Sequence, residues 1–185
     1  MTDGISTPQL LDPARALQEV GVKQGEKVAD FGCGSIGHFV FPAARFVGKD
    51  GKVYAIDIQK SALSGIESRM RLENTDNVQP LWGDIERPNG VRVPDQTFHV
   101  ALLVNNLFLV KGRDVMAEEV RRTTKAGGRL LVIDWLPSAS PVGPAPSDRV
   151  TADVAQKLFT AHGFELDHAF RPGPYHWGLV FKRES

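Results

Sequence analysis

A glycine-rich loop is the first segment of this sequence whose residue types and spacing could do chemistry. It reads Asp30-Phe-Gly-Cys-Gly-Ser-Ile-Gly37, and its glycines have the G-x-G-x-x-G spacing of dinucleotide-binding loops. Gly32 would permit a tight turn, Gly34 a close approach of backbone to ligand, and Gly37 close packing of a helix on a strand. The loop predicts a nucleotide-like ligand but does not by itself choose which one.

An acid about 20 residues later narrows the choice to a ligand that contains a nucleoside. Asp57 ends a predicted strand, and its two oxygens can each accept a hydrogen bond from one hydroxyl of a ribose diol. The alternative is an ordinary exposed acid at a strand end. Pro42 is tolerated only in a first helical turn, so the intervening helix is expected to begin near His38–Phe39 and to direct free N–H groups at the ligand.

Two further acids favour a cationic nucleoside over a pyrophosphate. Asp30 stands two residues before the first glycine, where a carboxylate would repel a pyrophosphate but would suit the ammonium and sulfonium of S-adenosylmethionine. In Gly83-Asp84-Ile85, the acid could accept from an adenine amino group and the isoleucine could cover the ring face, although Gly-Asp also forms an ordinary turn. A Tyr-x-x-x-Lys pair typical of one dehydrogenase group is absent from the sequence.

The remaining reactive side chains give weaker signals. Cys33 is interpreted as a small residue in a tight loop, and the five histidines do not stand at metal-ligand spacing, so no metal site is expected. His38, at the mouth of the first helix, and His176 are the weak candidates for a catalytic base or a substrate anchor. Asp134-Trp135 ends a strand and is either packed or in contact with an acceptor, and both interpretations stay open.

The elements that must position these residues follow from hydrophobic periodicity. Near-continuous apolar runs at 28–31, 53–56, 100–104 and 130–133 predict strands covered on both faces, and Pro80 confines the strand 78–82 to a sheet edge. Helices are expected behind the possible caps Ser61 and Asp114, the second ending before Gly127-Gly128, and a third helix carries Val150, Val154 and Leu158. Two strands at 164–170 and 177–181, joined by a short link, must be antiparallel.

The expected fold is therefore α/β. Five βα-type units and a C-terminal antiparallel hairpin make a doubly wound, seven-stranded, mostly parallel sheet. We expect one domain over residues 1–185, with a helical N-terminal preface at 1–25 and a core at 26–185. A Pro-rich loop at 136–147 follows the fifth strand on the carboxyl side of the sheet, where ligands of open α/β folds bind, and its role is left open.

Composition limits the compartment and the partners. The 185 residues include 22 Lys+Arg and 22 Asp+Glu with no basic half, so nucleic acid is an unlikely main partner. The longest apolar run is far shorter than the ~20 residues of a membrane-spanning helix, and the first residues do not resemble a signal peptide. The lone cysteine fits a reducing compartment, so a cytoplasmic protein is expected, with its oligomeric state unknown.

Five segments in order resemble the class I S-adenosylmethionine-dependent methyltransferases, in particular the small-molecule group that includes the ubiquinone/menaquinone C-methyltransferases. The segments are Val-Ala-Asp-Phe-Gly-Cys-Gly (28–34), Val-Tyr-Ala-Ile-Asp-Ile (53–58), Gly-Asp-Ile (83–85), Val-Ala-Leu-Leu-Val-Asn (100–105) and Ala-Gly-Gly-Arg-Leu-Leu-Val-Ile-Asp (126–134). The resemblance implies a Rossmann-like methyltransferase fold. One departure is that Ile36 stands where the family usually has its third glycine, which makes the loop one residue longer before Gly37.

Carried over by position, the resemblance also implies roles for nine residues at the donor site. These are Gly32, Cys33 and Gly34 along the methionine moiety with Asp30 supporting it, Asp57 on the ribose, Ile58 against adenine, Asp84 and Ile85 at the adenine edge, and Asn105 near the methionine amino end. The acceptor pocket is expected from residues 1–25, the stretch after Asn105, the Pro-rich loop and 175–177.

The sequence thus leads to the hypothesis of methyl transfer from S-adenosylmethionine to a small-molecule acceptor by in-line displacement, with S-adenosylhomocysteine as the product. The alternatives are an NAD(P)-dependent oxidoreductase that uses the same glycine loop, and a non-catalytic domain that only binds S-adenosylmethionine. Neither the acceptor nor the atom methylated can be identified from the sequence.

Overall fold

The seven predicted strands form one sheet in the computed structural model, which describes residues 10–138 and 140–185. Its elements in chain order are α1 (Pro13–Glu19), β1 (Lys27–Phe31), α2 (Val40–Val47), β2 (Lys52–Asp57), α3 (Lys60–Glu73), β3 (Val78–Trp82), β4 (Phe98–Val104), α4 (Arg113–Thr123), β5 (Thr124–Trp135), the 3₁₀ turn η1 (Pro146–Asp148), α5 (Ala152–Ala161), β6 (Phe164–Gly173) and β7 (His176–Arg183).

The strand order is that of a doubly wound sheet with a terminal hairpin. The strands lie in the order β3-β2-β1-β4-β5-β7-β6; the first five are parallel, and β7 pairs antiparallel with both β5 and β6. Pro80 lies on the edge strand β3, where its missing N–H costs no ladder bond. The predicted fold class and the edge position of β3 are confirmed.

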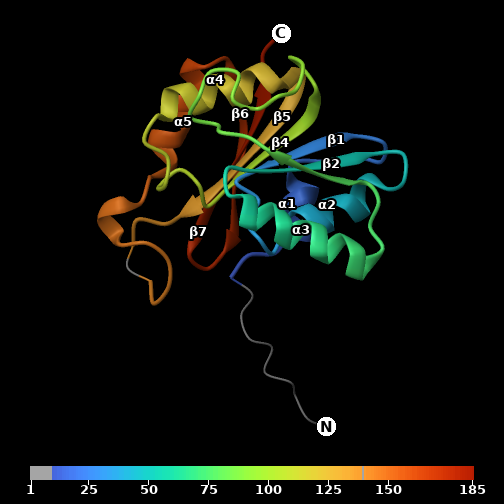
Figure 1. Ribbon diagram of the computed structural model, residues 1–185. Helices are drawn as coiled ribbons and strands as arrows, with labels where there is room; N and C mark the ends of the chain where they lie inside the picture. Colours follow the sequence, from blue (N-terminus) through green and yellow to red (C-terminus); the bar gives the residue numbers. More distant parts are fainter. Residues whose placement is uncertain (1–9, 139) are drawn as a thin grey trace.

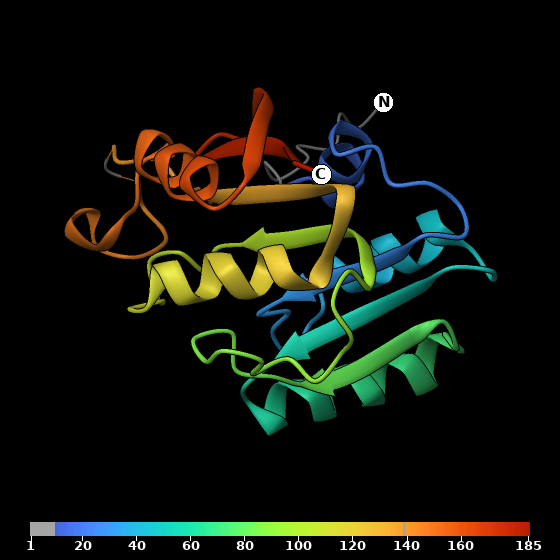
Figure 2. The ribbon, with the colours of Figure 1, turned by 90° about the horizontal axis from the view of Figure 1, so that it is seen from above.

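Helices cover both faces of the sheet, as Figures 1 and 2 show. α1, α2 and α3 lie on one face and bury Leu17, Phe41 and Ile66 against it. α4 and α5 lie on the other face, where Met116 and Phe159 pack. Because both faces are covered, the central strands are mostly apolar, with runs such as Val100–Val104 that do not alternate with polar residues.

Hydrogen bonds to two acidic side chains, Asp57 and Glu86, move two helix starts from their predicted places. Asp57 Oδ1 accepts from Gln59 N at 2.9 Å and closes the turn before α3, so Ser61 lies inside that helix instead of capping it. Before α4, Glu86 Oε2 accepts from the N–H groups of Lys111 and Gly112, so Gly112 is the N-cap and Asp114 lies in the first turn. The two cap predictions were wrong for this reason.

The start of α5 and the end of α4 can also be compared with the helix boundaries predicted from the sequence. Thr151 caps α5 by accepting from Val154 N at 3.3 Å, so Val150 lies before the helix instead of within it. The end of α4 agrees with its prediction, since the helix stops at Thr123, before Gly127-Gly128, and these two glycines lie inside the long strand β5.

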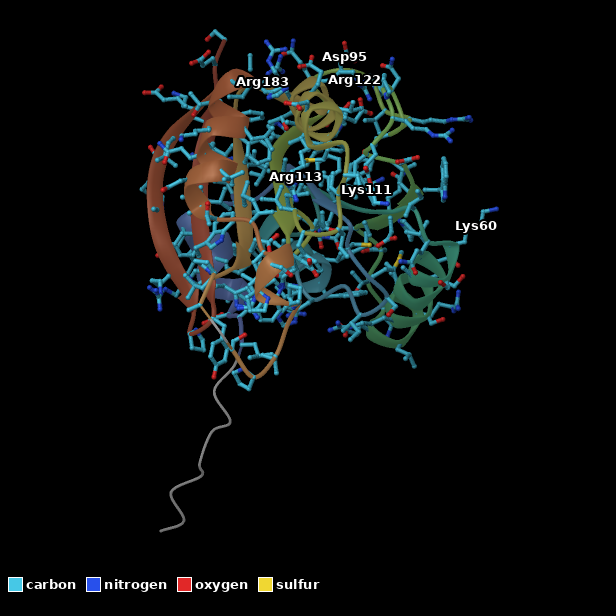
Figure 3. The ribbon with its side chains drawn as sticks, turned by 90° about the vertical axis from the view of Figure 1, so that its left-hand side faces the viewer. Lys60, Asp95, Lys111, Arg113, Arg122 and Arg183 are labelled. Carbon is cyan, nitrogen blue, oxygen red and sulfur yellow. The ribbon has the colours of Figure 1, made fainter. Side chains whose placement is uncertain are left out.

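The connection from β3 to β4 carries no helix, so the prediction of five βα units was wrong at the third unit. Residues 83–97 are instead held by a buried ion pair on α4. Glu119 accepts from Val91 N at 2.9 Å and pairs with Arg122 at 2.8 Å. Arg122 also donates to the carbonyl oxygen of Val91 and pairs with Asp95, beside which Figure 3 shows it. These contacts of Glu119 and Arg122 with Val91 and Asp95, which we call the clamp, hold the β3–β4 connection in the absence of a packed helix there.

The N-terminal preface is partly described. Asp12 caps α1 by accepting from Arg15 N at 3.2 Å, and Pro13 occupies the first helical position. Residues 1–9 of the predicted preface lie outside the described residues. Among the described residues, none of the helices has the length and apolar character that crossing a membrane requires.

Candidate functional site

The glycine loop between β1 and α2 is shaped by backbone conformations and a close contact that favour glycine. Gly32 has a φ of 70°, and a Cβ at this position would lie 2.2 Å from the side-chain oxygen of Asn106. Gly34 has a φ of 63°, and nothing within 4 Å would meet its Cβ, so its surface is open toward a ligand. Gly37 lies against Ile66 of α3 and Phe41 of α2, so it brings two helices together instead of a helix and a strand.

Asp57 ties this loop to β2. Its Oδ2 accepts from Gly34 N at 3.0 Å and its Oδ1 accepts from Gln59 N at 2.9 Å, and the residue is buried. Each carboxylate oxygen can accept more than one hydrogen bond, so both oxygens retain capacity for a second donor. Asp57 therefore shapes the site as well as lining it.

The carboxyl edge of the sheet holds a cavity of about 520 Å³. Seven of the nine predicted donor-site residues line it: Gly32, Gly34, Asp57, Ile58, Asp84, Ile85 and Asn105. Residues not among the predicted nine also line it, namely Ile56, Gln59, Gly83, Glu86, Val104, Asn106, Leu109 and Val110. The apolar run after β4 was the available signal for Leu109 and Val110, which come from the stretch expected to help form the acceptor pocket.

A smaller cavity of about 120 Å³ adjoins the larger one. Gly32, Val104 and Asn105 line both, so the two cavities meet at the end of β4. The smaller one is completed by Leu11, Asp30, Cys33, His38 and Phe39. All nine predicted donor-site residues thus line one continuous region, while their roles in binding stay predictions.

Asp30 has the most unusual electrostatics in this region. It is only 3% exposed, and no ion pair to it is found among the described residues. Burial, and then the nearby charge of Asp57, raise its pKa to about 8. Burial, and then the charges of Asp30 and Asp57, raise the pKa of the Cys33 thiol well above its ordinary value, which disfavours its thiolate form.

Asp84 serves as both a turn residue and a cavity-lining residue. Its Oδ1 accepts from Glu86 N at 3.0 Å, and its Oδ2 pairs with Arg87 at 3.1 Å. The alternative interpretation of Gly-Asp as an ordinary turn is therefore correct for the local backbone. The carboxylate nevertheless lines the larger cavity, beside Ile85.

The two weak catalytic candidates lie in different surroundings. His38 is exposed and lines the smaller cavity. His176 is 1% exposed and stacks on Trp135 with 4.1 Å between ring centroids, and burial lowers its pKa to about 4. His176 lines neither cavity, so of the two only His38 is placed to meet a ligand there.

The Pro-rich loop, expected to help build the acceptor pocket, is folded around Arg149. The guanidinium donates to the carbonyl oxygens of Leu136 and Pro144, each at 2.9 Å. Gly143 packs so closely against the ring of Trp135 that a Cβ there would lie 2.7 Å from it. The described residues of this loop, and residues 175–177, line neither cavity. Trp135 is 8% exposed, which agrees with the packing interpretation.

Metal binding finds no support among the described side chains, where no group of three His, Cys, Asp or Glu residues could hold an ion. The chemistry available at this edge is instead that of buried carboxylates, backbone amides and apolar walls. Such a lining suits a ligand that carries positive charge together with hydroxyl groups and a flat apolar ring.

Comparison with known sequences places the chain in a family. A family model described as "Methyltransferase domain" matches residues 22–159. The ubiquinone/menaquinone biosynthesis C-methyltransferase UbiE of Hydrogenovibrio crunogenus is 27% identical over 77% of this chain and 55% of its own length. The UbiE of Pasteurella multocida is 34% identical over 62% of this chain and 42% of its own length. The chain thus spans about half the length of these curated relatives.

Solved structures give the same result over nearly the whole chain. A SAM-dependent methyltransferase from Aquifex aeolicus superimposes with a TM-score of 0.87 and 26% identity, covering 94% of this chain and 90% of that chain. A putative type 11 methyltransferase from Sulfolobus solfataricus has a TM-score of 0.77 and 28% identity, with 96% and 95% covered. The chain therefore belongs to the methyltransferase-domain family, and it has the fold of the S-adenosylmethionine-dependent methyltransferases.

Proposed function

We propose that this protein transfers the methyl group of S-adenosylmethionine to a small-molecule acceptor. The observation that carries the proposal is the buried Asp30 carboxyl group, which lies beside the glycine loop and has no ion pair with any of the described residues. A buried acid of this kind costs free energy unless a ligand supplies the opposite charge. S-adenosylmethionine carries an ammonium and a sulfonium, and the acidic lining fits it better than it fits a diphosphate.

The proposed donor site assigns one part of the ligand to each part of the cavity. Asp57 accepts from the ribose hydroxyls while it holds Gly34. Ile58 and Ile85 cover the adenine, and Asp84 accepts from its amino group. The backbone of Gly32, Cys33 and Gly34 lines the methionine moiety, which Asp30 and Asn105 support at its amino end. These assignments rest on the cavity lining and on the resemblance of the sequence motifs.

Bound at this site, S-adenosylmethionine supplies an electrophilic methyl carbon on a positively charged sulfur. An acceptor atom attacks that carbon with its electron pair, the carbon–sulfur bond breaks with its electrons going to sulfur, and the acceptor loses a proton where it carries one. The protein's part is to hold the two reacting atoms about 3 Å apart and in line, away from water. Leu11 and Phe39 contribute apolar walls to this enclosure, and His38 is the candidate to take up a proton.

A small acceptor is favoured by the relatives and by the fold. The names of the UbiE relatives assign them C-methylation in quinone biosynthesis. Within residues 10–138 and 140–185, no further domain that could bind a macromolecule is inserted between the strands. We also propose that residues 1–185 act as one domain, in the cytoplasm and without nucleic acid as a partner, as the charge balance and the single cysteine suggest.

Thermal unfolding tests the proposal against its main rival. A ligand at 100 times its dissociation constant adds about 2.7 kcal/mol, which raises the melting temperature by a few degrees in a domain of this size. We expect S-adenosylhomocysteine to raise it and NADH to leave it unchanged. The reverse result would contradict the proposal. Stabilisation by S-adenosylmethionine without acceptor-dependent release of S-adenosylhomocysteine, across a broad metabolite panel, would instead indicate a binding-only domain.

A further inference from the structure

The turn that follows β4 is fastened to the strands on both sides of it. Asn105 N donates to the carbonyl oxygen of Ile133 on β5 at 2.8 Å. The side-chain amide of Asn106 donates to the carbonyl oxygen of Phe31, at the end of β1, at 2.9 Å. Leu107 N donates to Asp134 Oδ2 at 2.9 Å. The turn is therefore fixed between the ends of β1 and β5.

Asp134 and Arg113 hold Leu107 from opposite sides of its backbone. Arg113 Nε donates to the carbonyl oxygen of Leu107 at 3.1 Å, while Asp134 accepts from the N–H of the same residue. The other oxygen of Asp134 accepts from Trp135 N at 2.7 Å, and the residue is fully buried. Asp134 lines neither cavity, so it has no route to a ligand except through the turn that it holds.

Asn105 is the residue of the turn that faces the site. It has a φ of 55°, in the left-handed region that residues with side chains seldom adopt. It lines both cavities where they meet. Its side-chain oxygen is buried and has no hydrogen-bond partner among the described residues. A conformation of this kind persists only when its surroundings impose it, and here Asp134 and Asn106 are the surroundings.

We propose that Asp134 is a positioning residue for the amino-acid end of the methyl donor: through Leu107 it keeps Asn105 in the left-handed turn at the junction of the two cavities. This inference rests on the proposed function. The ammonium of the methyl donor gives Asn105 Oδ1 a hydrogen-bond donor that none of the described residues supplies, and Asp134 itself touches no part of the ligand.

Two ligands that differ only at this end test the proposal. S-adenosylhomocysteine has the amino-acid end, and 5′-methylthioadenosine has the same nucleoside without it. In Asp134→Asn, one acceptor oxygen becomes an N–H donor that faces a backbone N–H, so the turn loosens. We expect calorimetric titration to show about 5- to 20-fold weaker binding of S-adenosylhomocysteine and less than a twofold change for 5′-methylthioadenosine.

Glu119→Gln is the matched control. Glu119 is also a buried carboxylate that accepts from two backbone N–H groups, those of Asn89 and Val91, but it lies in the clamp of the β3–β4 connection. We expect this variant to melt at a lower temperature and to keep the wild-type ratio of the two affinities, because the clamp holds Asp84 and Ile85, which face the nucleoside that both ligands share. A loss in Asp134→Asn that matches the loss in Glu119→Gln would show a general effect of instability and would overturn the proposal.

The other outcomes also decide the question. Equal weakening of both ligands in Asp134→Asn, or no weakening of either, would contradict a role at the amino-acid end. Should that variant fail to fold, Asn106→Ala releases the same turn from β1 and is expected to give the same preference for loss of S-adenosylhomocysteine. A wild type that binds neither ligand would overturn the proposed function and this inference with it, whereas a wild type that binds both isolates the role of Asp134.

Discussion

Two buried carboxylates on opposite sides of this molecule have opposite surroundings. Glu119 is 2% exposed, forms an ion pair with Arg122 and accepts hydrogen bonds from two backbone N–H groups. Asp30 is 3% exposed and has no ion pair among the described residues. The first acid holds a connection in place. The second lies in a cavity at the carboxyl edge of the sheet, and its charge becomes favourable only when a cation enters. The difference separates a structural acid from a binding acid.

The largest effect is expected where the structural pair is broken. Glu119→Ala leaves the partly buried Arg122 without its main partner and frees the residues between β3 and β4. Removing one member of a buried pair costs about 3 to 5 kcal/mol, and we expect a loss of that size in the free energy of unfolding from denaturant titration. Glu118→Ala, at an exposed acid beside it on α4, is the control and is expected to change stability by less than about 0.5 kcal/mol. Equal losses would remove the distinction.

Asp30, in contrast, is expected to destabilise the unliganded protein when its carboxyl group ionises. Because burial raises the pKa of Asp30 from 3.8 to about 8, its stabilising contribution is complete below about pH 4 and is lost as the pH rises to about 8. Within this window the free energy of unfolding of the unliganded protein should fall by up to about 1.4 kcal/mol per pH unit. In Asp30→Asn this part of the pH dependence should disappear. An unchanged slope in the variant would show that Asp30 titrates as an ordinary surface acid.

A smaller effect, on ligand affinity, is expected at Asp57, which is both a structural acid and a binding acid. It holds Gly34 and Gln59 like a structural acid, yet its carboxylate lines the cavity. We expect Asp57→Ala to weaken S-adenosylhomocysteine binding by roughly 1.5 to 3 kcal/mol, the value of charged hydrogen bonds, while circular dichroism shows an intact fold. Asp50→Ala, at an exposed acid in the loop before β2, is the control. Wild-type affinity in Asp57→Ala would remove this residue from the donor site.

The fold could be predicted from the sequence because strands covered on both faces leave a local signal. Continuous apolar runs, the glycine loop and Pro80 each depend on near neighbours in the chain, and the sheet they predicted is the sheet observed. The helix starts at α3 and α4 were wrong because other acids accept from the N–H groups before them: Asp57, two residues before Gln59, and Glu86, from a distant part of the chain. The helix predicted after β3 was also wrong, because the β3–β4 connection is held by Glu119 and Arg122 of the distant helix α4.

The candidate site divides in the same way. The acids at the strand ends could be found from their spacing, and the structure brings them to one region. Three features of the site could not be predicted from the sequence. They are that no described residue forms an ion pair with Asp30, that Asn105 Oδ1 has no hydrogen-bond partner among the described residues, and that Asp134 accepts from Leu107 N. Each depends on which side chains of distant segments come within about 3 Å of one another. Spacing identifies acids at an edge, but only the packed structure distinguishes the satisfied acids from the unsatisfied one.

Proton release on ligand binding tests the central claim most directly. At pH 7 a carboxyl group with a pKa of about 8 is mostly protonated, and a bound ammonium favours its ionised form. Titration calorimetry of S-adenosylhomocysteine in two buffers of different ionisation enthalpy counts the protons released. The account predicts release approaching one proton per ligand for the wild type and markedly less for Asp30→Asn. Equal release by the two proteins, or no binding by the wild type, would contradict the claim that Asp30 awaits a cationic ligand.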